Sequence, residues 1–114
     1  MKKVLCFDLD NVICKTKKNN YKTSRPIKKN IKKINTLYDN GFVIKIFTAR
    51  YMGRNNDNRL KAYRMGYKLT KFQLRKWKVK FHKLIFGKPS YDLFVDDKAI
   101  FFKKNWINSI DKYL

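Results

Sequence analysis

Val4-Leu5-Cys6-Phe7-Asp8-Leu9-Asp10-Asn11 is the stretch that decides the fold. Its first four residues form an unbroken apolar run with the length of one buried strand, and two carboxylates follow it. Because a charge is costly inside an apolar strand, we expect Asp8 at the carboxyl end, where parallel α/β sheets bind ligands. Two acidic side chains there can hold a hard cation through oxygen, and one of them can attack an electrophile. Taken alone, such a pair more often marks a solvated turn that follows a strand, and the later motifs decide between the two interpretations.

Three later apolar runs end in polar residues in a comparable way: Phe47-Thr48-Ala49-Arg50, Phe86-Gly87-Lys88-Pro89 and Leu93-Phe94-Val95-Asp96-Asp97. The order of Asp-x-Asp, strand-end Thr, Lys and Asp-Asp resembles the haloacid dehalogenase-like superfamily of phosphotransferases, over residues 3–99. In detail, the motifs FTAR, GKPSYD and VDDKA are most similar to those of small phosphatases encoded among bacterial capsule and surface-polysaccharide genes.

Length and composition predict one globular domain over residues 1–114. The chain is 44% hydrophobic, and its apolar runs are too short to cross a bilayer. The first apolar run breaks at Asp8, which is unlike a signal peptide, so we expect a cytoplasmic protein. Cys6 and Cys14 lack metal-ligand spacing and are interpreted as reduced thiols.

The charge of the chain is unusual. There are 29 basic and 8 acidic residues, a net charge of +21, and every acidic residue is Asp. Half of the acids are Asp8, Asp10, Asp96 and Asp97, which favours a site that needs negative charge. The positive excess either attracts an anionic substrate or polymer, or reflects a genome rich in Lys and Asn codons. We favour the compositional explanation, because the basic residues are spread along the chain.

The order of predicted elements indicates an α/β fold. Strands are expected at 3–7, 42–47, 83–86 and 92–95. Pro26 begins a helix with Ser24 as a possible cap, and Gly41 ends it. Further helices are expected at 59–65, closed by Gly66, at 70–77, capped by Thr70, and within 100–114. Alternation of strands and helices predicts right-handed crossovers and a three-layer, Rossmann-like parallel sheet. The resemblance implies that the first strand is central, beside the second and fourth.

The resemblance also implies roles for the strand-end residues. Asp8 would be the nucleophile, and Asp10 the acid/base, with its carbonyl oxygen bound to metal. The Thr48 hydroxyl, the neighbouring Ala49 N–H and Lys88 would bind the transferring phosphoryl group. Mg²⁺ would be held by Asp8, Asp10 and an acid of the fourth strand, with Asp97 the better match and Asp96 the alternative.

Other residues near these motifs have open interpretations. Arg50 and Arg54 follow Thr48 and either clamp an anionic part of the substrate or are solvated surface residues. The segments 11–47 and 49–87 are too short for the cap domain that most relatives insert. We therefore expect an open site that takes a bulky substrate or is covered by a second copy of the chain.

These observations predict a Mg²⁺-dependent phosphatase that acts on a phosphorylated metabolite or sugar intermediate of surface-polysaccharide synthesis. One alternative is a phosphatase of nucleic-acid ends, suggested by the +21 charge and 16% aromatic content. Another is a non-catalytic basic binding module, which the intact set of strand-end residues argues against.

Overall fold

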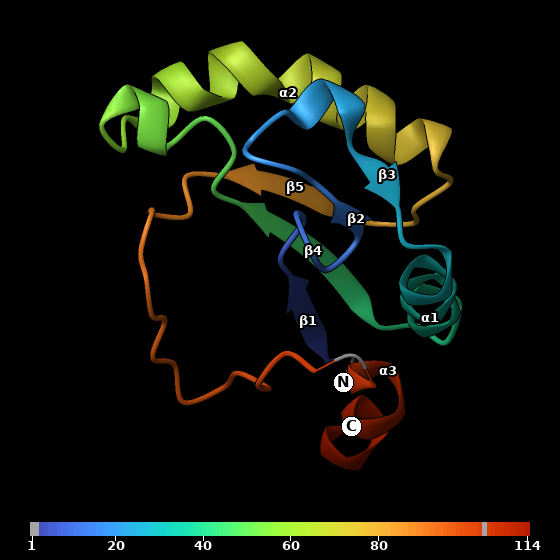
Figure 1. The fold of residues 1–114 in the computed structure, drawn as a ribbon. Helices are drawn as coiled ribbons and strands as arrows, with labels where there is room; N and C mark the ends of the chain where they lie inside the picture. The colour runs from blue at the N-terminus through green and yellow to red at the C-terminus, as the bar shows by residue number, and fades with distance from the viewer. Residues whose placement is uncertain (1–2, 104) are drawn as a thin grey trace.

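The computed structural model describes residues 3–103 and 105–114. Its elements are the strands β1 (Val4–Phe7), β2 (Cys14–Lys15), β3 (Arg25–Pro26), β4 (Val43–Thr48) and β5 (Lys83–Phe86), the α-helices α1 (Lys28–Asp39), α2 (Arg59–Lys76) and α3 (Trp106–Ser109), and the 3-10 helices η1 (Tyr21–Thr23), η2 (Gly53–Asn55) and η3 (Ile110–Tyr113). The fold is α/β and Rossmann-like, with a parallel sheet flanked by helices (Figure 1).

The sheet has the order β1-β4-β5, and both pairings are parallel. Along β4 the residues alternate, so that Ile44, Ile46 and Thr48 are buried while the residues between them are half-buried. Ile44 and Ile46 belong to a core with Ile34 of α1 and Leu74 of α2. This packing fixes the carboxyl ends of the three strands at one edge of the sheet.

Helix α1 confirms the helix predicted before Gly41, and it packs on the core through its buried apolar residues Ile31, Ile34 and Leu37. Gly41 follows it with a φ of 95°, a left-handed conformation that glycine adopts without strain. The predicted start is wrong, since Pro26 pairs with Cys14 in a short antiparallel ladder between β3 and β2. The Ser24 hydroxyl does not cap α1, because it lies 2.7 Å from that of Thr16.

Helix α2 is one continuous helix of 18 residues where the sequence predicted two. Asn58 caps its start by accepting a hydrogen bond from the Lys61 N–H. Gly66 and Thr70, predicted as an end and a cap, are buried inside the helix. Tertiary packing overrides these local signals, because the Tyr51 ring lies where a Gly66 side chain would be.

The predicted strand at 92–95 is absent from the described structure. The chain after β5 is extended and exposed, and Figure 1 draws it in orange, running outside the sheet to α3. Its start folds locally: the Tyr91 and Phe94 rings lie 5.0 Å apart and both contact the Lys88 ammonium. With residues 92–95 outside the sheet, β1 pairs with β4 alone among the described strands, and it lies at an edge rather than the centre of the sheet.

The C-terminal helix is shorter than predicted, with α3 and then η3, and residue 104 lies outside the described residues. Trp106 of α3 packs on Phe7 of β1, with ring centroids 5.6 Å apart. Asp111 pairs with Lys33 of α1 at 3.0 Å. Across the described ranges, no helix has the length and hydrophobicity needed to cross a membrane.

Candidate functional site

The candidate site lies at the carboxyl edge of the sheet. Asp8 follows β1, Thr48 ends β4, and Lys88 follows β5 after Gly87, whose φ is 109°. Because these strands are neighbours in the sheet, residues far apart in sequence converge there. The Lys88 N–H donates to the Thr48 carbonyl at 3.2 Å, and the Lys88 ammonium lies 3.7 Å from Asp8 Oδ2.

The Asp8 carboxylate is partly buried, with 39% of its side chain exposed. Oδ1 accepts a hydrogen bond from the Leu9 N–H at 2.8 Å, and Oδ2 faces Lys88. Burial raises the pKa of Asp8 above its ordinary value, and the nearby Lys88 charge opposes that effect. The Asp8 carboxylate is therefore partly desolvated and still open to a ligand, which suits a nucleophile.

The Lys88 side chain is more enclosed than that of Asp8, with 12% exposed. Its ammonium lies 5.5 Å from the centre of the Tyr91 ring and 5.3 Å from that of Phe94. Burial alone lowers the pKa of Lys88, but Tyr91 and Asp8 outweigh it, and the pKa is raised. Lys88 is thus a fixed positive charge beside Asp8.

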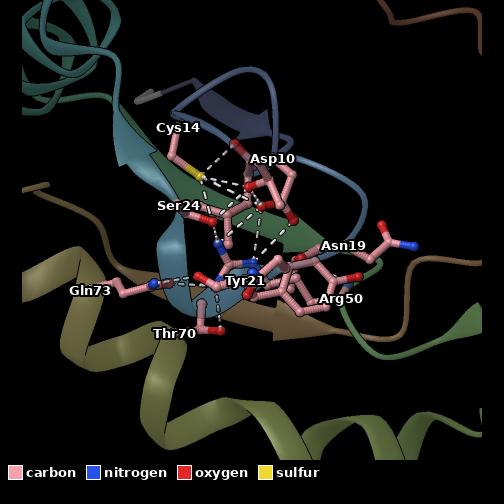
Figure 2. Close-up of polar contacts among 12 residues, drawn as sticks. Asp10, Cys14, Asn19, Tyr21, Ser24, Arg50, Thr70 and Gln73 are labelled. Atoms are coloured by element: carbon pink, nitrogen blue, oxygen red, sulfur yellow. Dashed lines mark hydrogen bonds and ion pairs between the residues drawn. The ribbon is translucent and has the colours of Figure 1, made fainter. Parts of the chain in front are cut away.

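Asp10 is bound by Arg50, which lies two residues after the end of β4. Arg50 Nε donates to Asp10 Oδ1 at 3.1 Å and to Oδ2 at 3.0 Å, and Nη2 donates to Oδ1 at 3.0 Å. The Thr16 hydroxyl donates to Oδ1 at 2.5 Å. Figure 2 shows these contacts around the Arg50 guanidinium. The arrangement fixes the orientation of the Asp10 carboxylate, of which 21% is exposed.

The interpretation of Arg50 as a solvated surface residue is wrong, because only 1% of the residue is exposed. It continues the buried face of β4 by two residues beyond Thr48, and it therefore points under α2. There Nη1 donates to the Thr70 hydroxyl at 3.1 Å and to Gln73 Oε1 at 2.6 Å. Arg50 thereby connects Asp10 to α2.

Thr48 is also fully buried, and its hydroxyl oxygen accepts a hydrogen bond from the Arg50 N–H at 3.1 Å. Its hydroxyl is not open to solvent as a phosphate donor would be, while Ala49 beside it is half-buried. Arg54 is exposed, donates to the Asn19 carbonyl at 3.2 Å and lies over the Tyr51 ring. Arg54 is thus the predicted clamp residue that a bound anion can reach.

Asp96 and Asp97 are not gathered with Asp8. Both are exposed in the segment after β5, and Asp96 Oδ1 accepts a hydrogen bond from the Lys98 N–H, as in an Asx turn. In residues 3–103 and 105–114, no three acidic, histidine or cysteine side chains lie close enough together to hold a metal ion. The oxygen donors of Asp8 and Asp10 fit Mg²⁺ in kind, since Mg²⁺ takes one or two carboxylates and keeps several waters.

Cys14 joins the network as a buried thiol. Its sulfur lies 3.6 Å from Arg50 Nη2 and 3.6 Å from Asp10 Oδ1. Burial, followed by the Asp10 charge, raises the pKa of Cys14 to about 11. Cys6 and Cys14 are both free, as predicted, and Cys14 is protonated at neutral pH.

Sequence reasoning missed the polar residues that surround Arg50, which are Thr16, Ser24, Thr70 and Gln73. One signal was available in α2. Thr70 and Gln73 share the helix face that carries Ala62, Gly66 and Leu74, all of them buried. Polar residues on a buried face need hydrogen-bond partners, which indicates a buried polar group opposite them.

Comparison with known proteins supports the fold. No family model and no curated protein matches the chain. The structure is similar to the crystal structure of an MCSG target from Vibrio cholerae, with a TM-score of 0.81 and 23% sequence identity. The match covers 97% of this chain and 98% of the other, so the two chains share the whole fold.

Proposed function

We propose that the protein is a phosphatase that hydrolyses phosphate monoesters through an aspartyl-phosphate on Asp8. The supporting observation is the convergence of Asp8, Asp10 and Lys88 at the carboxyl edge of a parallel sheet. This edge is where such sheets bind ligands, and phosphoryl transfer requires a carboxylate nucleophile, a positive charge and a proton donor together.

The chemistry assigns one task to each of these groups. An Asp8 carboxylate oxygen forms a bond to phosphorus as the bond to the leaving oxygen breaks, and protonated Asp10 gives that oxygen a proton. Asp10 then takes a proton from a water molecule that attacks the aspartyl-phosphate, which releases phosphate and restores Asp8. Lys88, 3.7 Å from Asp8, stabilises the negative charge on the transferring group.

Mg²⁺ is the proposed cofactor. The Asp8 carboxylate and the Asp10 main-chain oxygen would hold it, and Asp97 or Asp96 would add a further carboxylate. When bound, the ion neutralises charge on the phosphoryl oxygens. The contact between Asp8 and Lys88 is present in the metal-free structure.

The proposed substrate is a phosphorylated metabolite or sugar intermediate of surface-polysaccharide synthesis, met in the cytoplasm. The choice of this pathway is supported by the sequence motifs FTAR, GKPSYD and VDDKA. The partly exposed Asp8 and the exposed Arg54 support a site that admits a bulky ester or is completed by a second copy of the chain.

The experiment is a phosphate-release screen of the purified protein with Mg²⁺. Its substrates are sugar phosphates, amino-alcohol phosphates, nucleotides and 3′-phosphorylated oligonucleotides. Asp8→Asn keeps the shape of the side chain and removes the attacking charge, so turnover should be lost while the folded circular-dichroism spectrum remains. Asp92→Asn makes the same change at an exposed residue and should leave turnover intact. Normal turnover by folded Asp8→Asn protein would contradict the proposal.

A further inference from the structure

A chain of buried polar contacts runs from α2 to the acid/base candidate. Thr70 and Gln73 bind Arg50, and Arg50 binds Asp10 (Figure 2). We propose that Arg50 is a positioning residue, anchored from α2, that holds the Asp10 carboxylate in one orientation and leaves Oδ2 as its less engaged oxygen. This inference rests on the proposed function, because it assigns the orientation of a catalytic group.

The first step is that Arg50 has no donor left for a substrate. Its guanidinium has five N–H groups. Nε donates to Asp10, Nη1 donates to Thr70 and Gln73, and Nη2 donates to Asp10 and to the Ser24 hydroxyl at 3.2 Å. With 1% of the residue exposed, a bound anion would have to displace one of these partners. Arg50 therefore acts through Asp10.

The second step concerns the two oxygens of Asp10. Oδ1 accepts hydrogen bonds from Arg50 Nε, Arg50 Nη2 and the Thr16 hydroxyl, and it also faces the Cys14 thiol. Oδ2 accepts from Arg50 Nε at 3.0 Å and has no other partner in the described part of the chain. A carboxylate oxygen with two lone pairs and one shared donor still has room for a further hydrogen-bond partner. The contacts thus leave Oδ2 as the oxygen of Asp10 that a substrate group can engage.

The third step is that α2 fixes the guanidinium from the far side. Thr70 is 0% and Gln73 6% exposed, and Gln73 Nε2 donates to the Tyr21 carbonyl at 2.6 Å. Gln73 thereby locks Arg50 against the loop that carries η1, and the Arg50 guanidinium also lies 4.9 Å from the centre of the Tyr21 ring. Removal of either α2 partner would leave buried donors unpaired and allow Arg50 to shift.

The test compares Thr70→Val with Thr70→Ser. Valine keeps the shape and removes the hydroxyl, whereas serine keeps the hydroxyl. For the best phosphate ester, Thr70→Val should lower kcat by about 3- to 10-fold, the worth of one hydrogen bond, with KM unchanged. Thr70→Ser should retain most of the wild-type kcat. In an Asp10→Asn background, Thr70→Val should cause no further loss, because its effect passes through Asp10.

A second readout does not depend on activity. The Arg50 Nε–H, assigned by its loss in Arg50→Lys, should give a solvent-protected ¹⁵N signal that shifts in Asp10→Asn. An unprotected signal, or one that does not shift in Asp10→Asn, would overturn the positioning role of Arg50. A raised KM with unchanged kcat in Thr70→Val would make Arg50 a substrate-binding residue instead.

The two proposals fail in different ways. An active wild-type enzyme whose Thr70→Val variant keeps its full kcat overturns the positioning role alone. A wild-type protein that hydrolyses no phosphate ester overturns the proposed function, and with it the catalytic role of this network.

Discussion

Lys88 is one of 29 basic residues, and its surroundings distinguish it from the rest. Two aromatic rings and the Asp8 carboxylate enclose its ammonium, so that 12% of the side chain is exposed. A solvated lysine would lose rotamer freedom on binding a phosphate, whereas Lys88 is already ordered beside the expected nucleophile. Asp8 is itself partly buried, and Lys88 offsets only part of the cost of its charge.

Asp8→Asn should therefore stabilise the metal-free protein near neutral pH. The folded-state pKa of Asp8 lies above its ordinary value of 3.8, chiefly through burial, so the folded state favours the protonated acid. That contribution is fully present below pH 3.8 and is lost as the pH rises through the folded-state pKa. The melting temperature of Asp8→Asn should exceed that of wild type at pH 7 in EDTA, and the gap should close at acid pH. A less stable variant at pH 7 would show that pairing with Lys88 outweighs burial.

The residues of the site were predictable to different degrees. Asp8 and Lys88 each follow an apolar run, and neighbouring parallel strands bring such positions together, so their approach could be inferred. Arg50 could not be placed in this way, because its burial depends on polar partners in α2, which lies about 20 residues later. The burial of Thr48 likewise depends on which face of β4 the helices cover.

At the scale of elements, the regular β–α alternation was the predictable part. The predicted strand at 83–86 agrees with β5, and those at 3–7 and 42–47 agree with β1 and β4 to within one residue at each end. The prediction of two helices in place of α2 was wrong, because packing overrides the local helix-end signals of Gly66 and Thr70. The prediction of a strand at 92–95 was wrong, because an apolar run does not by itself show burial, and Leu93 and Val95 are 80% and 89% exposed here.

Gly66→Ala should destabilise the contact between α2 and the sheet. The new Cβ would lie 2.4 Å from Tyr51 Cδ2 and 3.0 Å from Phe86 Cε2. Alanine gains about 1 kcal/mol in helix propensity, but overpacking of a buried contact costs about 1–3 kcal/mol. Urea unfolding should show a lower midpoint, with the exposed Lys68→Ala substitution as a neutral control. An unchanged or higher midpoint for Gly66→Ala would mean that the Tyr51 ring moves freely.

The segment after β5 carries the predicted acids of the metal site. If the chemistry uses Mg²⁺ as proposed, Asp97→Ala should weaken Mg²⁺ binding more than Asp96→Ala, because Asp97 is the better match to the expected ligand. In this structure Asp96 Oδ1 is engaged by the Lys98 N–H. Calorimetric titration of both variants decides the order, with Asp92→Ala as a control in the same segment. Stronger weakening by Asp96→Ala would make Asp96 the direct ligand.

At the scale of the whole molecule, the net charge of +21 separates the rival functions. A nucleic-acid enzyme with six or more phosphate contacts should lose about 10³-fold or more in affinity between 50 and 200 mM salt. We expect weak, nonspecific oligonucleotide binding instead, and faster turnover of the best small phosphate than of a 3′-phosphorylated oligonucleotide. Parallel turnover assays check this. Faster dephosphorylation of oligonucleotide ends than of every metabolite tested would favour the alternative function.

The extended segment after β5 also has a colloidal consequence. Leu93 is 80% and Val95 89% exposed, and β1 leaves one edge open in the described sheet. An open edge and an apolar segment are the features through which proteins adhere to one another. At low ionic strength the like charge of two copies keeps these surfaces apart, whereas at 1 M salt the repulsion reaches only about 3 Å. Raising the ionic strength is therefore expected to promote association between molecules of this protein in solution.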